Sequence, residues 1–197
     1  WNHQRYLKRL FESLRTQTYK DMQVLYIDNA SKDGSLEFVR EHFPEVNVLK
    51  NNNNLGFTGA HNQGFQLALS KCAPVDMDSR YVFVLNPDIV ATPTFIEELV
   101  RVADAHPEVG VIGGKLYRMF SVDGMDEELE QVDASEMIDS TGIVRHPNGR
   151  VTDRGAGEMD SQQYPEGEVW GISGAAMLVR LSAAESVREK DAVFDAD

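Results

Sequence analysis

Short apolar runs alternate with stretches of helical periodicity, and this alternation constrains the fold more than any other feature of the sequence. The runs lie at residues 23–27, 46–49, 81–85 and 109–112, and the third is apolar without interruption. A strand with apolar side chains on both faces is typical of a parallel sheet that helices cover on each side. The runs are therefore predicted to be strands.

Apolar residues recur at helical spacing between these strands. Residues 6–14, 59–69 and 95–105 place apolar side chains on one face, which indicates helices. The alternation of strands and helices continues to about residue 115. It predicts a Rossmann-like α/β sandwich with a mostly parallel central sheet and helices on both faces.

The pattern changes after residue 118, where a small inserted lobe is predicted. Residues 121–139 carry eight acidic side chains and no basic one, and we expect this acidic insertion to be solvated and mobile. The pair Asn148-Gly149, between short apolar pieces, indicates a β-hairpin. Residues 116–170 then form a lobe inserted into a single domain.

The composition excludes several classes of protein. The 197 residues include 32 acidic and 19 basic side chains, and the resulting net charge of −13 disfavours binding to nucleic acid or anionic lipid through bulk charge. The single cysteine, Cys72, excludes an internal disulfide and fits a reducing compartment. No apolar run is long enough for a predicted membrane span.

Polar turns follow two of the predicted strands, and ligands of open α/β sheets bind at that end of the strands. Asp28 and Asn29 follow the first strand and offer hydrogen-bonding groups that suit a pyrimidine base. Asp88 follows the third strand and suits Mg²⁺ or Mn²⁺, since one or two carboxylates and substrate phosphates usually hold such ions. Ordinary turn and helix-cap chemistry also explains each of these residues when it is considered alone.

A third polar segment, residues 54–62, leads into a predicted helix. Its Gly56 and Gly59 allow the backbone to approach a ligand closely, and a helix N-terminus favours an anion such as phosphate. The segment matches neither a Walker loop nor the dinucleotide-binding fingerprint. An ordinary glycine turn is an equally good interpretation.

Taken in order along the chain, these motifs resemble the family-2 nucleotide-sugar glycosyltransferases, which have the GT-A fold. The resemblance rests on Trp1-Asn2, Ser13-Leu14 with Gln17-Thr18, Asp28-Asn29-Ala30-Ser31, the segment from Asn54 to Asn62, and Asn86-Pro87-Asp88. Three further segments resemble the bacterial rhamnosyltransferase-type members, namely Ile138 to Gly142, Asp153 to Gly155 and Ser173 to Leu178. The resemblance covers nearly the whole chain apart from the acidic stretch.

The resemblance implies a role for particular residues. Asp88 stands at the last position of a D-x-D-like motif whose first position is Asn86, so a single carboxylate would bind a divalent Mg²⁺ or Mn²⁺ ion. Trp170 and Gly174 would shape the sugar and acceptor side of the site. The donor-binding residues would be Asn2, Asp28, Asn29, Asn54, Gly59, Asn62 and Asn86.

The resemblance also implies that parts of the family's catalytic domain lie outside these residues. The family's first strand would precede Trp1, and its catalytic base, the Asp of a Glu-Asp pair, would follow Asp197. We therefore expect a fragment cut at both ends and inactive by itself, in which Asp195 and Asp197 are not the base. Residues 1–115 would be the nucleotide-binding half and residues 116–197 the acceptor-side half.

The implied activity is the inverting transfer of a sugar, with rhamnose as one candidate, from a nucleoside diphosphate donor. The acceptor would be a glycan or a lipid-linked molecule in cell-surface polysaccharide synthesis. The implied location is the cytoplasm, either free or associated with the inner face of the membrane, and a homodimer would cover the gap left by the missing strand. Two alternatives stay open: a sugar nucleotidyltransferase, and a non-catalytic nucleotide-sugar-binding domain.

Overall fold

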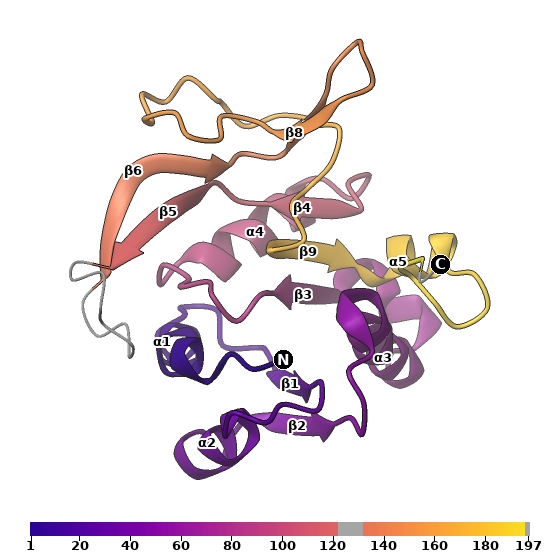
Figure 1. Ribbon diagram of the computed structural model, residues 1–197. Coiled ribbons are helices and arrows are strands. Elements are labelled where there is room, and N and C mark those ends of the chain that lie inside the picture. Colours follow the sequence, from indigo (N-terminus) through magenta and orange to yellow (C-terminus); the bar gives the residue numbers. More distant parts are fainter. Residues whose placement is uncertain (122–131, 196–197) are drawn as a thin grey trace.

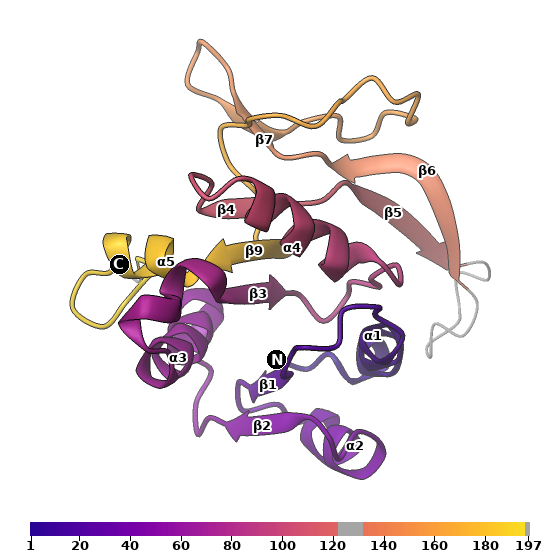
Figure 2. The same cartoon turned by 180° about the vertical axis from the view of Figure 1, so that it is seen from behind.

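The computed structural model describes residues 1–121 and 132–195, which form layers of helices and strands (Figures 1 and 2). The helices are α1 (Gln4–Arg15), α2 (Ser35–His42), α3 (Gly56–Lys71), the 3₁₀ helix η1 (Pro74–Ser79), α4 (Phe95–Ala105) and α5 (Leu181–Val187). The strands are β1 (Leu25–Asp28), β2 (Asn47–Lys50), β3 (Tyr81–Leu85), β4 (Val111–Gly113), β5 (Leu116–Ser121), β6 (Val132–Ser140), β7 (Ile143–Arg145), β8 (Val151–Asp153) and β9 (Ala176–Arg180). Among the described residues, no helix combines the length and the apolar character needed to cross a membrane.

Two hydrogen-bonded sheets form the centre of the molecule. Strands β1 and β2 pair in parallel, with Leu25 opposite Asn47 and Asp28 opposite Lys50. Strand β9 lies between β3 and β4 and runs antiparallel to both. The α/β class is confirmed, but the prediction of one mostly parallel sheet is wrong. Within the described residues, β1 and β3 share no ladder, and the strand at the centre of the larger sheet is antiparallel.

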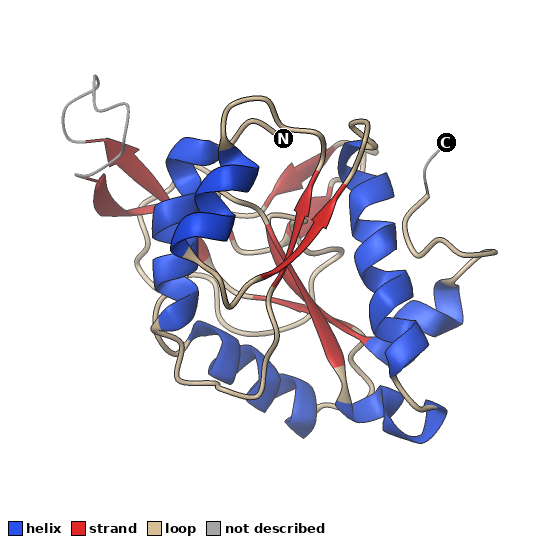
Figure 3. Ribbon diagram, turned by 90° about the horizontal axis from the view of Figure 1, so that it is seen from below, coloured by secondary structure: helices blue, strands red, loops and turns tan. Residues whose placement is uncertain are grey.

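Strand β9 is buried along its whole length and separates two apolar clusters. Leu178 packs in the cluster formed by α1, α2 and α4, whereas Met177 and Val179 pack in the cluster that includes Phe65 of α3 and Ala184 of α5. Successive side chains of a strand point to opposite faces, so one strand supplies both clusters. Helices accordingly lie on both sides of the strands, as the sequence predicts (Figure 3).

Arg180, the last residue of β9, is only 5% exposed and bonds to neutral acceptors. Its guanidinium donates hydrogen bonds to the carbonyl oxygens of Asp78, Ala103, His106 and Val109 and to the Tyr81 hydroxyl. Ala103 and His106 lie at the C-terminal end of α4, where the last carbonyls lack partners within the helix and a cation also interacts favourably with the helix dipole. Arg180 therefore fastens β9 to α4.

Two hairpins form the lobe at the top of Figure 1. The β7–β8 hairpin confirms the prediction from Asn148-Gly149, and Gly149 has a φ of +82° at its tip. The predicted mobile acidic stretch spans residues 121–139. Of these, residues 122–131 lie outside the described residues, and residues 132–139 belong to β6, which pairs antiparallel with β5.

Gln17 is completely buried and ties α1 to the start of α4. Its Nε2 donates to the carbonyl oxygens of Ser13 at 3.1 Å and Thr92 at 2.8 Å. Its Oε1 accepts the N–H of Ile96 at 3.1 Å, and that N–H lies in the first turn of α4, where the helix offers it no carbonyl. Ser13 adds a second link, because its Oγ accepts the N–H of Ala91 at 3.2 Å. The Ser13-to-Thr18 motif thus holds the segment that follows Asp88.

Replacing Gln17 with alanine should lower the free energy of unfolding by about 2 kcal/mol, because the buried Ile96 N–H loses its acceptor. Urea denaturation of the two proteins measures the difference. The exposed Gln23 offers a matched control, and Gln23→Ala should change the same quantity by less than about 0.5 kcal/mol. Equal stability of Gln17→Ala and the unchanged protein would contradict this account of the motif.

Candidate functional site

The turn after β1 is built around the buried carboxylate of Asp28. Asp28 is 1% exposed, and its Oδ2 accepts the N–H of Ser31 at 3.2 Å. The Tyr26 hydroxyl donates to Asp28 Oδ1 at 3.4 Å, and burial together with the nearby carboxylate raises the pKa of Tyr26 to about 12. Ala30 has a φ of 63°, a value that non-glycine residues rarely adopt. Residues in such conformations cluster at functional sites.

Asn2 and Asp33 fasten the N-terminal segment to this turn. The Asn2 N–H donates to Ser31 Oγ at 3.1 Å, and Asn2 Oδ1 accepts the N–H of Lys32 at 2.9 Å. Asp33 Oδ2 accepts the N–H of Gln4 at 2.9 Å. Burial acts to raise the pKa of Asp33, but hydrogen bonds from hydroxyl and N–H groups outweigh it and hold the pKa below its usual value. The structure thus places Asn2 beside the turn that follows β1.

Asn29 connects the same turn to the loop before α3. Its Nδ2 donates to the carbonyl oxygen of Gly56 at 3.0 Å, and its Oδ1 accepts Asn51 Nδ2 at 2.9 Å and the Leu55 N–H at 3.3 Å. Asn51 exchanges two further hydrogen bonds with Gln63 of α3, both 2.9 Å long. Buried amides therefore set the position of this loop relative to β1.

Asn51 and Gln63 were not predicted from the sequence as parts of the site. The strand pattern contained a signal for Asn51, because Asn51 directly follows β2 in the same way that Asn29 directly follows β1. The two strands are parallel neighbours, with Asp28 opposite Lys50, so the residues after them come side by side. Nothing in the sequence alone marks Gln63.

Asn54 and Gly59 shape the beginning of α3. Asn54 Oδ1 accepts the N–H of Gly56 at 2.9 Å, and Gly56 has a φ of +71°, which favours glycine. A Cβ atom on Gly59 would lie 2.8 Å from the Cβ of Leu55. Packing against Leu55 is therefore enough to explain the glycine at position 59.

Asn62 is buried in α3 and bonds to the C-terminal segment. Its Oδ1 accepts the N–H groups of Val193 and Phe194, each at 2.9 Å, and its Nδ2 donates to the carbonyl oxygen of Phe194 at 2.9 Å. The structure thus brings Asn62 together with the end of the described chain. That Asn62 lines a donor pocket stays a prediction.

The turn after β3 ends in the exposed Asp88. The N–H of Asn86 donates to the carbonyl oxygen of Ala175 at 2.8 Å, which continues the pairing of β3 and β9 into the turn. Burial and the N-terminal ammonium lower the pKa of His3, and the carboxylates of Asp88 and Asp33 oppose them. The charges of both carboxylates, one in each turn, therefore act on His3.

The described residues contain no group of three or more His, Cys, Asp and Glu side chains that could hold a metal ion. A single exposed carboxylate still suits Mg²⁺ or Mn²⁺, which take their other ligands from phosphates and water. Asp88 therefore fits an ion whose coordination a diphosphate completes, and it does not fit a closed protein cage.

The two predicted acceptor-side residues belong to different surroundings. A Cβ atom on Gly174 would lie 3.1 Å from the Phe57 ring, so Gly174 packs against the beginning of α3. Trp170 is 61% exposed, and its main-chain N–H donates to the carbonyl oxygen of Ile143, in the lobe, at 3.1 Å. Gly174 thus contacts the first turn of α3, whereas Trp170 belongs to the lobe.

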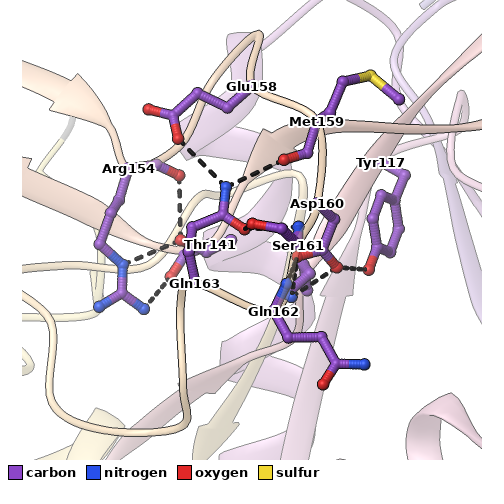
Figure 4. A network of polar contacts seen from close by, with 10 residues as sticks. Tyr117, Thr141, Arg154, Glu158, Met159, Asp160, Ser161, Gln162 and Gln163 are labelled. Carbon is purple, nitrogen blue, oxygen red and sulfur yellow. Dashed lines mark hydrogen bonds and ion pairs between the residues drawn. The ribbon is translucent and has the colours of Figure 1, made fainter.

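Thr141 and Arg154 hold the lobe together through reciprocal hydrogen bonds (Figure 4). The N–H and Oγ1 of Thr141 each donate to the Arg154 carbonyl oxygen at 3.0 Å. The Arg154 guanidinium donates to Thr141 Oγ1 at 2.9 Å and to its carbonyl oxygen at 3.0 Å. Thr141 and Arg154 belong to two of the segments that resemble the rhamnosyltransferase-type enzymes. Their hydrogen bonds give these segments a structural role as well.

Asp160 connects the irregular segment after β8 to β5 through a hydrogen bond with Tyr117 (Figure 4). Its carboxylate accepts Lys115 Nζ at 2.7 and 2.9 Å and also accepts the Tyr117 hydroxyl. The hydrogen bonds from Lys115, from Tyr117 and from the Gln162 N–H lower the pKa of Asp160 to about 2. The same bond to Asp160 raises the pKa of Tyr117 to about 12.

Replacing Asp160 with asparagine should remove a pH-dependent part of the stability. A carboxyl group whose pKa falls on folding stabilises the folded state above its ordinary pKa, here 3.8, and loses this effect as the pH falls through its folded value of about 2. The difference in free energy of unfolding between the two proteins should therefore be full at neutral pH and shrink between about pH 4 and about pH 2.

Urea denaturation across this pH range measures the difference. Glu168→Gln, at an exposed carboxylate of the same lobe, is the matched control and should leave the profile unchanged. A stability difference for Asp160→Asn that is the same at neutral pH as near pH 2 would contradict the lowered pKa.

An α/β domain that gathers polar turns at the carboxyl ends of its strands has the arrangement of ligand-binding α/β enzymes. Residues 1–155 match the sequence profile of the family described as glycosyl transferase family 2. The chain belongs to this family.

Two curated relatives and one solved structure show how far the similarity extends. An N-acetylglucosaminyl-diphospho-decaprenol L-rhamnosyltransferase of Mycobacterium tuberculosis is 32% identical over 110 residues, which are 55% of this chain and 36% of that protein. An uncharacterised glycosyltransferase of Nostoc sp. is 28% identical over 134 residues, which are 66% of this chain and 38% of that protein. The chain thus spans little more than a third of the length of these relatives.

The solved structure is that of S. aureus TarS, residues 1–349, in complex with UDP. It is 18% identical in sequence and aligns with a TM-score of 0.54 over 94% of this chain and 46% of that one. Together with the family match, this similarity confirms the GT-A type of α/β fold.

Proposed function

We propose that the chain binds a nucleoside diphosphate sugar and belongs to an enzyme that transfers the sugar, with inversion, to an acceptor hydroxyl in polysaccharide synthesis. One observation carries the proposal: in a member of glycosyl transferase family 2, Asn29 bonds the turn after β1 to the loop before α3. The chain is also similar in fold to a TarS structure that holds UDP, which supports a nucleoside diphosphate as the ligand.

Each polar turn has its own part in this proposal. The turn that Asp28 and Asn29 hold binds the nucleotide base, with Asn2 beside it. Asn54 and Gly59 line the donor pocket at the beginning of α3, where N–H groups of the first turn have no carbonyl partner within the helix and the helix dipole attracts a phosphate. Asn86 lines the pocket from the turn after β3.

Asp88 would hold Mg²⁺ or Mn²⁺ together with the phosphates of the donor. When bound, such an ion supplies positive charge that stabilises a diphosphate leaving group. The chain's own residues bind and orient the donor. A general base must also remove the proton of the acceptor hydroxyl, and we assign none of the described residues to that step.

The acceptor side is formed by Trp170 and Gly174. The similarity to a protein named as a decaprenol-linked L-rhamnosyltransferase supports rhamnose as the transferred sugar and a lipid-linked acceptor. A lipid-linked acceptor in turn favours the cytoplasmic face of the membrane as the site of action. The homodimer expected from the sequence stays a prediction.

Replacing Asp88 with asparagine should abolish the Mn²⁺-dependent part of donor binding, because a neutral amide is a weaker ligand for a hard cation. A panel of nucleotide sugars, with and without Mn²⁺, is tested on the full chain by thermal and urea unfolding. A true donor at a hundredfold excess over its Kd should raise the free energy of unfolding by about 2.7 kcal/mol. In Asp88→Asn, the stabilisation by the donor in the presence of Mn²⁺ should fall to the stabilisation measured without the metal.

The control is Asp76→Asn, because Asp76 is exposed on η1 and lies before β3 instead of after it. It should bind the donor like the unchanged protein. Equal Mn²⁺-dependent affinity in Asp88→Asn would refute the role of Asp88, and failure of the unchanged chain to bind any nucleotide sugar would refute the proposed function. Binding without release of nucleoside diphosphate, in a protein that includes the flanking sequence, would favour a non-catalytic domain.

A further inference from the structure

The three hydrogen bonds of Asn62 all end on the main chain of two consecutive residues. Val193 and Phe194 lie outside the helices and strands, so no ladder satisfies their N–H groups, and Asn62 Oδ1 accepts both of them. The amide returns a hydrogen bond from Nδ2 to the Phe194 carbonyl oxygen. An asparagine side chain can accept and donate at once, as this arrangement requires.

The Phe194 ring links the buried core to the beginning of α3. Its centroid lies 5.6 Å from that of Phe65, which is buried, and 6.0 Å from that of Phe57, which is partly exposed. The His61 ring lies 4.1 Å from Phe57 and 6.1 Å from Phe194. Gly174 also packs against the Phe57 ring. The position of Phe194 is thus coupled to the beginning of α3, which is proposed to line the donor pocket.

His61 takes part in this cluster through its ring and its Nδ1 atom. Burial lowers its pKa, and its Nδ1 lies 2.7 Å from the Phe57 carbonyl oxygen, which only accepts. The Nδ1–H therefore donates to Phe57, and the lowered pKa favours the neutral form of the ring. The cluster is apolar around one buried amide, that of Asn62.

We propose that Asn62 is a positioning residue that fixes Val193 and Phe194 on α3. The C-terminal segment up to Asp195 then keeps a constant position relative to the loop before α3. The proposal rests on the proposed function and deepens it. In this account Asn62 acts through the main chain of the C-terminal segment, and this role replaces the prediction that Asn62 lines the donor pocket. A displacement of that segment would misplace groups on the donor and acceptor sides, and a shift of about 1 Å costs on the order of a hundredfold in rate.

The test compares Asn62→Ala with the unchanged enzyme in two measurements. Hydrogen exchange should show the Val193 and Phe194 amides exchanging at least about tenfold faster, because their acceptor is gone. Steady-state kinetics on the natural protein that contains this chain should show kcat lower by about 10- to 100-fold, with the donor KM changed by less than about threefold. The split between kcat and KM separates positioning from donor contact.

Two further variants sharpen the test. Asn62→Asp keeps an acceptor for both N–H groups but places a second carboxylate oxygen opposite the Phe194 carbonyl oxygen, so it should retain part of the exchange protection and an intermediate kcat. It also serves if the alanine variant does not fold. Gln66→Ala is the matched control, since exposed Gln66 makes one bond to the Asp191 carbonyl oxygen at 3.0 Å from the same helix, and it should leave both measurements unchanged.

Each outcome decides the proposal. A weaker donor affinity with unchanged exchange at Val193 and Phe194 would mean that Asn62 touches the donor directly and would overturn it. Faster exchange with unchanged kcat would overturn it too, because the segment would then not matter for transfer. If the unchanged protein binds no nucleotide sugar, the proposed function fails, whereas the exchange measurement still reports whether Asn62 holds the segment.

Discussion

The burial of β9 between β3 and β4 is the constraint on which the rest of the structure depends. The strand has no exposed face, and it supplies Leu178 to one apolar cluster and Met177 and Val179 to the other. At its end, Arg180 satisfies carbonyl groups of α4, so the strand also fixes the helix that covers it. Its pairing with β3 extends to the Asn86 turn, and the core therefore also determines where Asp88 lies.

Amide side chains hold the irregular parts of the candidate site. Asn29 bonds the loop before α3, Asn62 bonds the C-terminal segment, and Gln17 bonds the beginning of α4. Each donates to a main-chain carbonyl oxygen and accepts a main-chain N–H, and buried main-chain groups need a partner. The loops around the proposed donor site are thus fixed by the protein itself, which lowers the cost of ordering them when a ligand binds.

Local pattern predicted the elements well where one strong periodicity was present. The bounds of β3 and α4 are those expected, at residues 81–85 and 95–105. The same pattern could not predict strand direction. The five residues of β9 are all buried, and such a run is equally compatible with a parallel or an antiparallel strand and with either sheet. The strand at residues 132–140 was also not predicted, since charge describes solvation and not whether a backbone finds a strand such as β5 to pair with.

The sequence by itself determined the α/β class and, through the order of its motifs, the family. Those signals are local, because periodicity, turn chemistry and motif spacing act over a few residues. Only the tertiary structure decided that Asp28 is buried under its own turn and that Asn62 bonds to Phe194. The partner of a buried amide is whichever main-chain group folding brings within about 3 Å. For Asn62 that group lies 132 residues away along the chain, beyond the reach of any local pattern.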